Sequence, residues 1–235
     1  MFQFKQFSVK QDKTAMKVGT DGVLLGSWAP VNHNPFSVLD IGAGTGIIAL
    51  MLAQRTHAEQ IDALEIDEDA YEQAVENFEN SPWGDRLFCF HAGLDEFIDE
   101  PEDEYDLIVS NPPFYAEDYK TENEQRDLAR FQDAMPFEEI VEAADLLLSE
   151  NGILAVILPY KEEEKFIALA KESELFPTKI TRVKGTPTSA IKRSLLAFSR
   201  NENPEIEIDE LTIEIDRHVY TLEYIELTKD FYLKM

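Results

Sequence analysis

The sequence has little of three things: cysteine, metal-ligand clusters and long apolar runs. Cys89 is the only cysteine among 235 residues, so no disulfide can form within the chain, and we expect a reducing, cytoplasmic location. The four histidines are scattered and no Cys/His group has the spacing of a zinc site, so we expect no metal. No apolar run approaches the roughly 20 residues of a membrane span, and the first residues lack the apolar core of a secretory signal. We therefore expect no membrane partner.

Basic side chains are also scarce, and they are unevenly distributed. The net charge of −26 at pH 7 by itself disfavours a nucleic-acid partner, because phosphate is repelled by an acidic surface. Residues 59–150 hold 29 acidic and four basic side chains, whereas residues 179–200 hold six basic and no acidic ones. The first twenty residues hold four lysines and one acid. Two interpretations stay open: a solvated acidic surface with chance basic patches, or a path for an anionic substrate.

Strand-like and helix-like segments alternate along most of the chain. This order predicts an α/β fold with a Rossmann-like, mostly parallel sheet, an antiparallel C-terminal edge and helices on both faces. In such sheets ligands bind beyond the C-terminal ends of the strands. We expect strands at 37–42, 59–67, 87–92, 105–110, 153–159, 179–185 and 194–200, a final strand pair at 211–216 and 219–227, and helices at 46–56, 68–80, 136–150 and 161–173.

A glycine-rich turn, "VLDIGAGTG", joins the first of these strands to a helix. Its glycines, Gly42, Gly44 and Gly46, allow a tight bend and a close approach to a ligand, and the helix start offers unpaired N–H groups. Asp40 lies two residues before the loop, which suits a ligand with an ammonium group better than a pyrophosphate. A purely structural turn is the alternative interpretation.

An acidic side chain follows the loop at the distance typical of nucleoside binding. Glu65 ends the strand at 59–67 and lies about 20 residues beyond the loop, where a carboxylate accepts hydrogen bonds from both ribose hydroxyls. For Asp67 we favour a helix N-cap instead.

Together the loop and Glu65 resemble class I S-adenosylmethionine-dependent methyltransferases. The resemblance implies S-adenosylmethionine as the cofactor and places Asp40 near its amino-acid end. Where that family often has an acid that contacts the adenine amine, this chain has "HAGLDEF", with Gly93 in the acid's place. Either Asp95 substitutes for that acid, or backbone atoms alone contact the adenine. The implied cofactor-binding residues are Lys17, Thr20, Asp40, Gly42, Ala43, Gly44, Gly46, Glu65, Ile66, Gly93, Leu94 and Asn111.

The segment "NPPF" stops the strand at 105–110 abruptly, because proline gives no N–H to a sheet. An amide oxygen of Asn111 and the carbonyl of Pro112 can accept both hydrogens of a planar amine, and the ring of Phe114 can stack on a base. Pro113 and Tyr115 would complete the hold on the base. A simple strand-terminating turn is the alternative. The loop suits adenine, guanine in RNA and glutamine side chains alike.

The two terminal segments give the most specific resemblance. "FKQFSVKQDKTAMKVGTDGVLLGSW" (4–28) and "YTLEYIELTKDFYLKM" (220–235) resemble the bacterial tRNA1(Val) (adenine-37 N6)-methyltransferase family. The resemblance implies methyl transfer to N6 of adenine-37 in the anticodon loop, tRNA as the partner and a monomer. A glutamine N5-methyltransferase acting on protein and a guanine-N2 RNA methyltransferase remain the alternatives.

On this resemblance residues 1–235 form a single methyltransferase domain with three parts. Residues 1–30 form a lid or substrate segment, in which a loop leads into an amphipathic helix; 37–200 form the catalytic core, and 201–235 add strands. The basic segment would then contact phosphate, and RNA binding should weaken steeply with salt. Arg126 is a further candidate, and the expected RNA contacts are Arg130, Lys179, Arg182, Lys184, Lys192 and Arg193.

Overall fold

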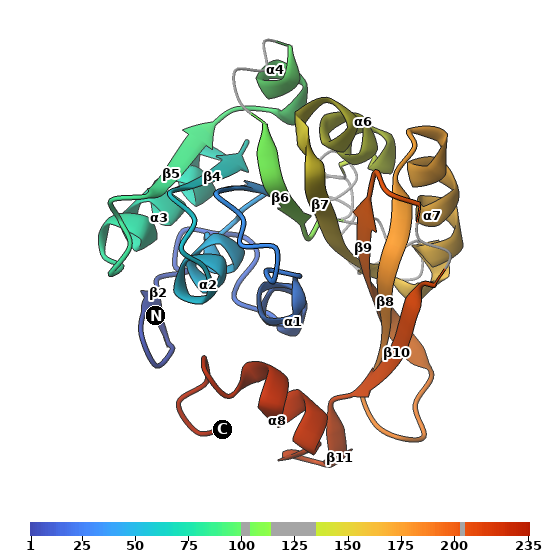
Figure 1. The fold of residues 1–235 in the computed structure, drawn as a ribbon. Helices are drawn as coiled ribbons and strands as arrows, with labels where there is room; N and C mark the ends of the chain where they lie inside the picture. The colour runs from blue at the N-terminus through green and yellow to red at the C-terminus, as the bar shows by residue number, and fades with distance from the viewer. Residues whose placement is uncertain (100–103, 114–134, 203–204) are drawn as a thin grey trace, which may run out of the picture.

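A computed structural model describes residues 1–99, 104–113, 135–202 and 205–235. An eight-stranded sheet with the order β10-β8-β9-β7-β6-β3-β4-β5 runs through the centre of the molecule (Figure 1). Its strands are β3 (Ser37–Ile41), β4 (Gln60–Glu65), β5 (Leu87–His91), β6 (Tyr105–Ser110), β7 (Leu148–Pro159), β8 (Phe176–Lys184), β9 (Ile191–Ser199) and β10 (Glu207–Thr212).

The sheet is mostly parallel, as the sequence predicts. All neighbours from β5 to β7 are parallel, and β9 is antiparallel to both β7 and β8. The outermost strand, β10, is again parallel to β8. The predicted α/β class is therefore confirmed, and its antiparallel character lies in β9.

Helices cover both faces because successive side chains of each strand point to opposite sides. Val38 and Val109 belong to one buried cluster, and their neighbours Leu39 and Ile108 belong to the other. The first cluster packs against α1 (Thr20–Trp28), α2 (Ile47–Arg55), α3 (Glu68–Glu79) and α8 (Leu222–Thr228). The second packs against α4 (Leu94–Ile98), α6 (Phe137–Leu147) and α7 (Glu163–Glu172), the last preceded by the short turn η1 (Tyr160–Glu162).

Helix α1 lies alongside α2 and points the same way. A methyl carbon placed on Gly22 would lie 3.3 Å from Ile47, and one on Gly26 would lie 2.8 Å from Met51. Gly22 to Trp28 are all buried, so the prediction of an amphipathic helix is wrong: α1 is buried all round. Its first residue thus lies beside the start of α2, where the glycine loop ends.

The C-terminal segment differs from the predicted strand pair. It forms two short strands, β11 (Glu214–Asp216) and β12 (Val219–Tyr220), and then helix α8. Thr221 caps this helix by accepting a hydrogen bond from Tyr224 N–H at 3.2 Å, and the buried Tyr224 and Thr228 lie one turn apart. The helix cap and this spacing override the strand-like composition of residues 219–227.

The two ends of the chain pack together (Figure 1). A short hairpin of β1 (Phe2–Gln3) and β2 (Ser8–Val9) opens the chain. Lys5 N–H donates to the Phe231 carbonyl at 2.8 Å.

The helix predicted at 136–150 ends earlier, at Leu147, and β7 begins directly after it. In the described parts of the chain, no helix is long and apolar enough to cross a membrane.

Candidate active site

The glycine loop follows β3 at the carboxyl edge of the sheet. Gly42, Gly44 and Gly46 all have positive φ, at 74°, 58° and 75°, a conformation that strongly favours glycine. The N–H groups of Gly42 and Ala43 donate to the Leu64 carbonyl at 3.0 and 2.9 Å. The loop is therefore fixed to the end of β4.

The two sides of this loop differ. A methyl carbon on Gly46 would lie 2.4 Å from the ring of Phe78, which comes from α3. One on Gly44 would meet no atom within 4 Å in the described structure. The loop thus rests on α3 at one side and is open to a ligand at the other.

Glu65 joins the loop to the start of α3. One carboxylate oxygen accepts from Gly44 N–H at 2.7 Å and the other from Asp67 N–H at 2.9 Å. Each oxygen keeps a second acceptor position, so the carboxylate can still accept hydroxyl groups. Asp67 accepts from Ala70 N–H at 2.8 Å, so its prediction as an N-cap is confirmed.

Asp40 is a completely buried carboxyl. Its Oδ2 accepts from Ala49 N–H at 3.1 Å, whereas Oδ1 has no hydrogen-bond partner among the described residues. Burial raises the pKa of Asp40 to about 7, and the negative charge of Glu65 adds to the effect. A buried, unpaired carboxyl oxygen is what a cationic ligand group would satisfy, so this residue fits a ligand that carries an ammonium group.

Ile66, Gly93 and Asp95 lie close together beside Glu65. Ile66 is 73% exposed, and a methyl carbon on Gly93 would lie 3.7 Å from Ile66 and 2.5 Å from Asp95 Oδ1. The Asp95 carboxylate therefore fills the place into which a side chain at position 93 would project. Leu94 is buried under this group. Exposed Ile66 offers an apolar surface, and Asp95 an acceptor, to a planar ligand.

Asn111 follows β6 directly, at the same edge as the glycine loop. Ser110 Oγ donates to the Ile41 carbonyl at 2.9 Å, which fixes the end of β6 to β3. Asn111 and Pro113 are half-buried and Pro112 is buried. In the described chain the Asn111 side chain makes no hydrogen bond. Phe114, Tyr115, Arg126 and Arg130 lie outside the described residues.

The predicted residues of the N-terminal segment lie at the start of α1 or just before it. Lys17 and Thr20 are both exposed, and Thr20 begins α1, whose start lies next to that of α2. Asp21 accepts from Arg193 Nε at 2.9 Å. The start of α1 is thus tied to β9 at the carboxyl edge of the sheet.

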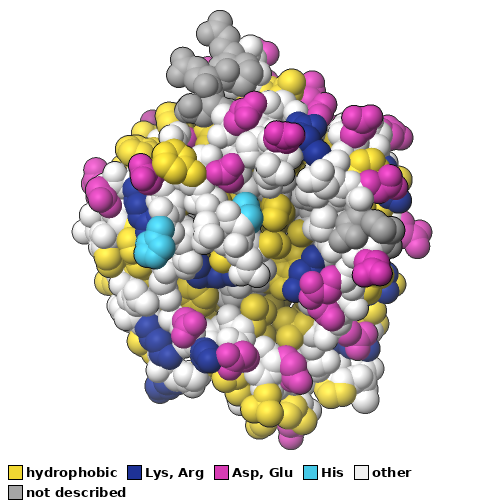
Figure 2. Space-filling view, viewed as in Figure 1, with side chains coloured by type: hydrophobic (Ala, Val, Ile, Leu, Met, Phe, Trp, Pro, Cys, Tyr) yellow, Lys and Arg dark blue, Asp and Glu magenta, His cyan; other side chains and the backbone are white. Residues whose placement is uncertain are grey.

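Most of the basic segment is paired with acids of the same chain. The ion pairs are Lys179–Glu207 at 2.8 Å, Arg182–Glu163 at 2.7 Å, Lys184–Glu210 at 2.7 Å and Arg193–Asp21 at 2.9 Å. Lys192 is exposed and makes no ion pair within the described residues. The segment is therefore not a bare positive surface, and acidic side chains are spread over the face seen in Figure 2.

The strand register shows which basic residues reach the carboxyl edge. Lys179 is on the same rung as Val109, so it lies within the sheet rather than beyond β6. Arg182 is level with Leu158, two residues past the rung of Ser110. Lys184, Lys192 and Arg193 lie at that level or further out. These four residues therefore lie beyond the level at which β6 ends, whereas Lys179 does not. No group of metal-ligating side chains occurs in the described residues.

Comparison with known proteins first gives the class. Residues 23–173 match the family described as methyltransferase small domain. The fold resembles that of a predicted O-methyltransferase from Agrobacterium tumefaciens, with a TM-score of 0.70 and 18% identity over 90% of this chain and 96% of that one. A ribosomal protein L11 methylase from Lactobacillus delbrueckii gives a TM-score of 0.54 and 20% identity over 77% of each chain. The fold is that of a class I methyltransferase.

Full-length relatives then give the family. A protein of Flavobacterium johnsoniae is 90% identical over all 235 residues of both chains, and one of Christiangramia forsetii is 63% identical over 100% of this chain and 98% of its own. Both are named tRNA1(Val) (adenine(37)-N6)-methyltransferase. The chain belongs to this family.

The buried carboxyl of Asp40 should make stability depend on pH. Because its pKa rises from 3.8 to about 7 on folding, the folded chain holds this proton more tightly than the unfolded chain. The resulting penalty is absent below the lower value, grows as pH rises between the two, and is constant above. Urea unfolding across this range should therefore show Asp40→Asn gaining stability relative to wild type as pH rises. The matched control is Asp67→Asn, which keeps a good N-cap; a parallel pH profile for Asp40→Asn and wild type would contradict the expectation.

Proposed function

We propose that this chain transfers a methyl group from S-adenosylmethionine to N6 of adenine-37 in the anticodon loop of tRNA1(Val). The observation that carries the chemistry is the amide of Asn111, which makes no hydrogen bond among the described residues and directly follows β6 at the edge where the glycine loop lies. The substrate is inferred from the full-length relatives, which are named for that reaction. Such a substrate would place the enzyme in the cytoplasm.

The cofactor site is supported by residues on three strand ends. Glu65 would accept the ribose hydroxyls, since each of its oxygens keeps an acceptor position. Asp40 would interact with the ammonium end, where its Oδ1 has no described partner. Asp95 would accept the adenine amine, because its carboxylate fills the space beside Gly93. This favours Asp95 over contacts with the backbone alone. The remaining proposed contacts are Lys17, Thr20, Gly42, Ala43, Gly44, Gly46, Ile66, Leu94 and Asn111.

The chain's own groups would act mainly by positioning the amine. When bound, S-adenosylmethionine would supply a methyl group made electrophilic by its positively charged sulfur. Asn111 Oδ1 and the carbonyl of Pro112 would accept the two N–H hydrogens of adenine and turn the nitrogen lone pair out of the ring plane. Rigid Pro112 and Pro113 keep the carbonyl in place. Phe114 and Tyr115 would hold the base by stacking.

We assign the catalytic core to residues 37–200, with residues 1–30 as a lid and substrate segment and 201–235 as a C-terminal addition. For the RNA path we retain Arg182, Lys184, Lys192 and Arg193, which lie beyond the end of β6; Arg130 stays a prediction. Lys192 is the strongest of these because no acid neutralises it in the described structure. Lys179, level with Val109 and paired with Glu207, is the weakest.

The alternative substrates use the same chemistry at the Asn-Pro-Pro-Phe loop. A protein glutamine and a guanine N2 amine both present a planar nitrogen that the loop could hold. The relatives' names favour adenine in tRNA over both.

The experiment that tests the proposal uses the purified chain, labelled S-adenosylmethionine, bulk tRNA and ribosome release factors as parallel substrates. Digestion and mass spectrometry of the RNA should find N6-methyladenosine at position 37 of one tRNA. Label on protein, or N2-methylguanosine in RNA, would overturn the proposed substrate.

Asn111→Ala should abolish most of the methyl transfer and weaken cofactor binding only slightly, because Asn111 is one of many proposed cofactor contacts. Loss of one acceptor aimed at the reacting amine should lower kcat by about 10²–10³-fold. S-adenosylhomocysteine affinity, measured by calorimetry, should fall only a few-fold, so the much larger loss of kcat would report the contact with the reacting amine. A variant that retains wild-type kcat would refute the role of Asn111.

Lys192→Ala should weaken tRNA binding uniformly across tRNA sequences. Removing one phosphate contact should reduce the slope of log affinity against log salt by about one. The control is Lys171→Ala, an exposed lysine at the C-terminal end of α7, which lies at the opposite edge of the sheet. Equal salt slopes for both variants in tRNA filter binding would remove Lys192 from the RNA path.

A further inference from the structure

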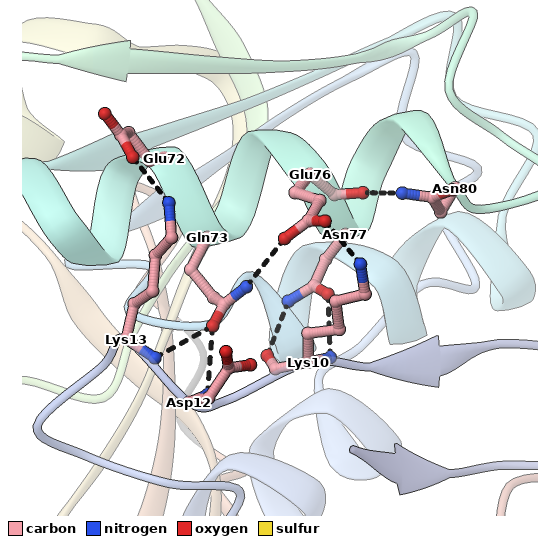
Figure 3. Close-up of polar contacts among 8 residues, drawn as sticks. All are labelled: Lys10, Asp12, Lys13, Glu72, Gln73, Glu76, Asn77 and Asn80. Atoms are coloured by element: carbon pink, nitrogen blue, oxygen red, sulfur yellow. Dashed lines mark hydrogen bonds and ion pairs between the residues drawn. The ribbon is translucent and has the colours of Figure 1, made fainter.

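Two buried amide side chains on α3 hold the N-terminal segment. Gln73 is 0% and Asn77 2% exposed, which is unusual for amides unless their polar atoms are paired. Figure 3 shows both pointing from α3 toward residues 10–13. We call residues 10–18, which lead from β2 toward α1, the N-terminal strap.

Gln73 fastens the middle of the strap. Its Oε1 accepts the backbone N–H groups of Asp12 at 3.0 Å and Lys13 at 3.1 Å, and its Nε2 donates to Glu76 at 3.1 Å. These bonds join two neighbouring backbone groups of the strap to one side chain. They make no contact with the glycine loop.

Asn77 makes a different set of bonds, because it reaches the strap and the glycine loop together. Its Oδ1 accepts from Lys10 N–H at 2.8 Å, and its Nδ2 donates to the Lys10 carbonyl at 3.0 Å and to the Thr45 carbonyl at 2.9 Å. Thr45 lies between Gly44 and Gly46. One side chain therefore links the strap directly to the loop that faces the ligand.

Ion pairs surround these amides but contribute less. Lys10 pairs with Glu76 and Lys13 with Glu72, as Figure 3 also shows. All four side chains are at least 39% exposed, and exposed pairs of this kind are screened by water and salt. If the strap detached from α3, polar atoms of the buried Gln73 and Asn77 amides would lose their hydrogen-bond partners. These amides therefore stabilise the docked strap more than the ion pairs do.

The strap continues to the start of α1. Val18 N–H donates to Gln11 Oε1 at 2.8 Å, which closes residues 11–18 into a loop. Helix α1 follows, beside the start of α2, and Asp21 at its start is tied to Arg193. Anything that orders the strap at α3 therefore also orders the backbone that leads to Lys17 and Thr20.

We propose that Asn77 is a positioning residue that couples cofactor binding to docking of the N-terminal strap. A glycine loop held in its binding conformation keeps the Thr45 carbonyl in place for Asn77. The bond to Thr45 holds the Asn77 side chain in the position from which it binds the Lys10 backbone. Docking of the strap and occupation of the cofactor site therefore favour one another. The coupling rests on the proposed function, because it takes S-adenosylmethionine as the ligand of the loop.

Coupling of this kind is reciprocal. If the docked strap strengthens cofactor binding by some factor, the cofactor must strengthen strap docking by the same factor. Hydrogen exchange of the Lys10, Asp12 and Lys13 amides reports docking, because each of these groups donates to an α3 side chain. Cofactor affinity reports the other half of the cycle.

The experiment follows hydrogen exchange with and without saturating S-adenosylhomocysteine in wild type, Gln73→Ala, Asn77→Ala and Asn80→Ala. In wild type the ligand should slow exchange at residues 10–13 by about tenfold, the factor expected for one to two hydrogen bonds. Asn77→Ala should bind the ligand about tenfold more weakly and lose this protection even when saturated. Gln73→Ala should exchange faster at the strap while the amides of the glycine loop stay unchanged.

Asn80→Ala is the matched control. Asn80 is the exposed C-cap of the same helix, and its side chain donates to the Glu76 carbonyl without reaching the strap or the glycine loop in the described structure, so its variant should behave as wild type in both measurements. If Asn77→Ala fails to fold, wild type alone decides, since equal strap exchange with and without bound ligand overturns the coupling. Retained strap protection in folded Asn77→Ala overturns it as well. Absence of any ligand binding by wild type instead overturns the proposed function and the coupling with it.

Discussion

The hydrogen bond from Gly44 N–H to the Glu65 carboxylate is the contact on which the rest of the site depends. It joins the glycine loop to the end of β4 at 2.7 Å, and the same carboxylate accepts from Asp67 N–H at the start of α3. Helix α3 then supports the loop from beneath through Phe78 and Asn77. The glycine loop is thus held on both flanks, while its outer side at Gly44 remains open.

The sequence predicts the parts of this arrangement that are local. The alternating elements, the glycine loop, the Asp67 cap and the abrupt end of β6 all follow from spacing and residue type, which act over a few positions. The α8 helix was missed because a strand-like composition concealed a threonine cap. The full burial of α1 does not follow from the sequence because it comes from packing against α2, α8 and β7 together, and sequence periodicity does not show how many neighbours a helix has.

Long-range pairing explains the other differences. Lysines and arginines near the C-terminus look like free phosphate contacts in the sequence, yet Arg193 pairs with Asp21 and Arg182 with Glu163. No local sequence pattern predicts the bond between Arg193 and Asp21, which lie 172 residues apart. The roles of Gln73 and Asn77 are hidden for the same reason: their partners are backbone groups, which every residue carries.

The same pairing bears on how so acidic a chain can act on RNA. Acids that neutralise the basic residues of β8 and β9 fix those side chains in place, and in the described part of the chain they leave little free positive charge on these two strands. Long-range attraction would then contribute little, and nonspecific binding to phosphate would be weak. On the proposed function, recognition would come instead from close contacts made after the RNA has arrived, at the Asn-Pro-Pro-Phe loop and at exposed groups such as Lys192. On the proposed function, an acidic chain whose cations on β8 and β9 are paired would therefore favour selectivity over affinity.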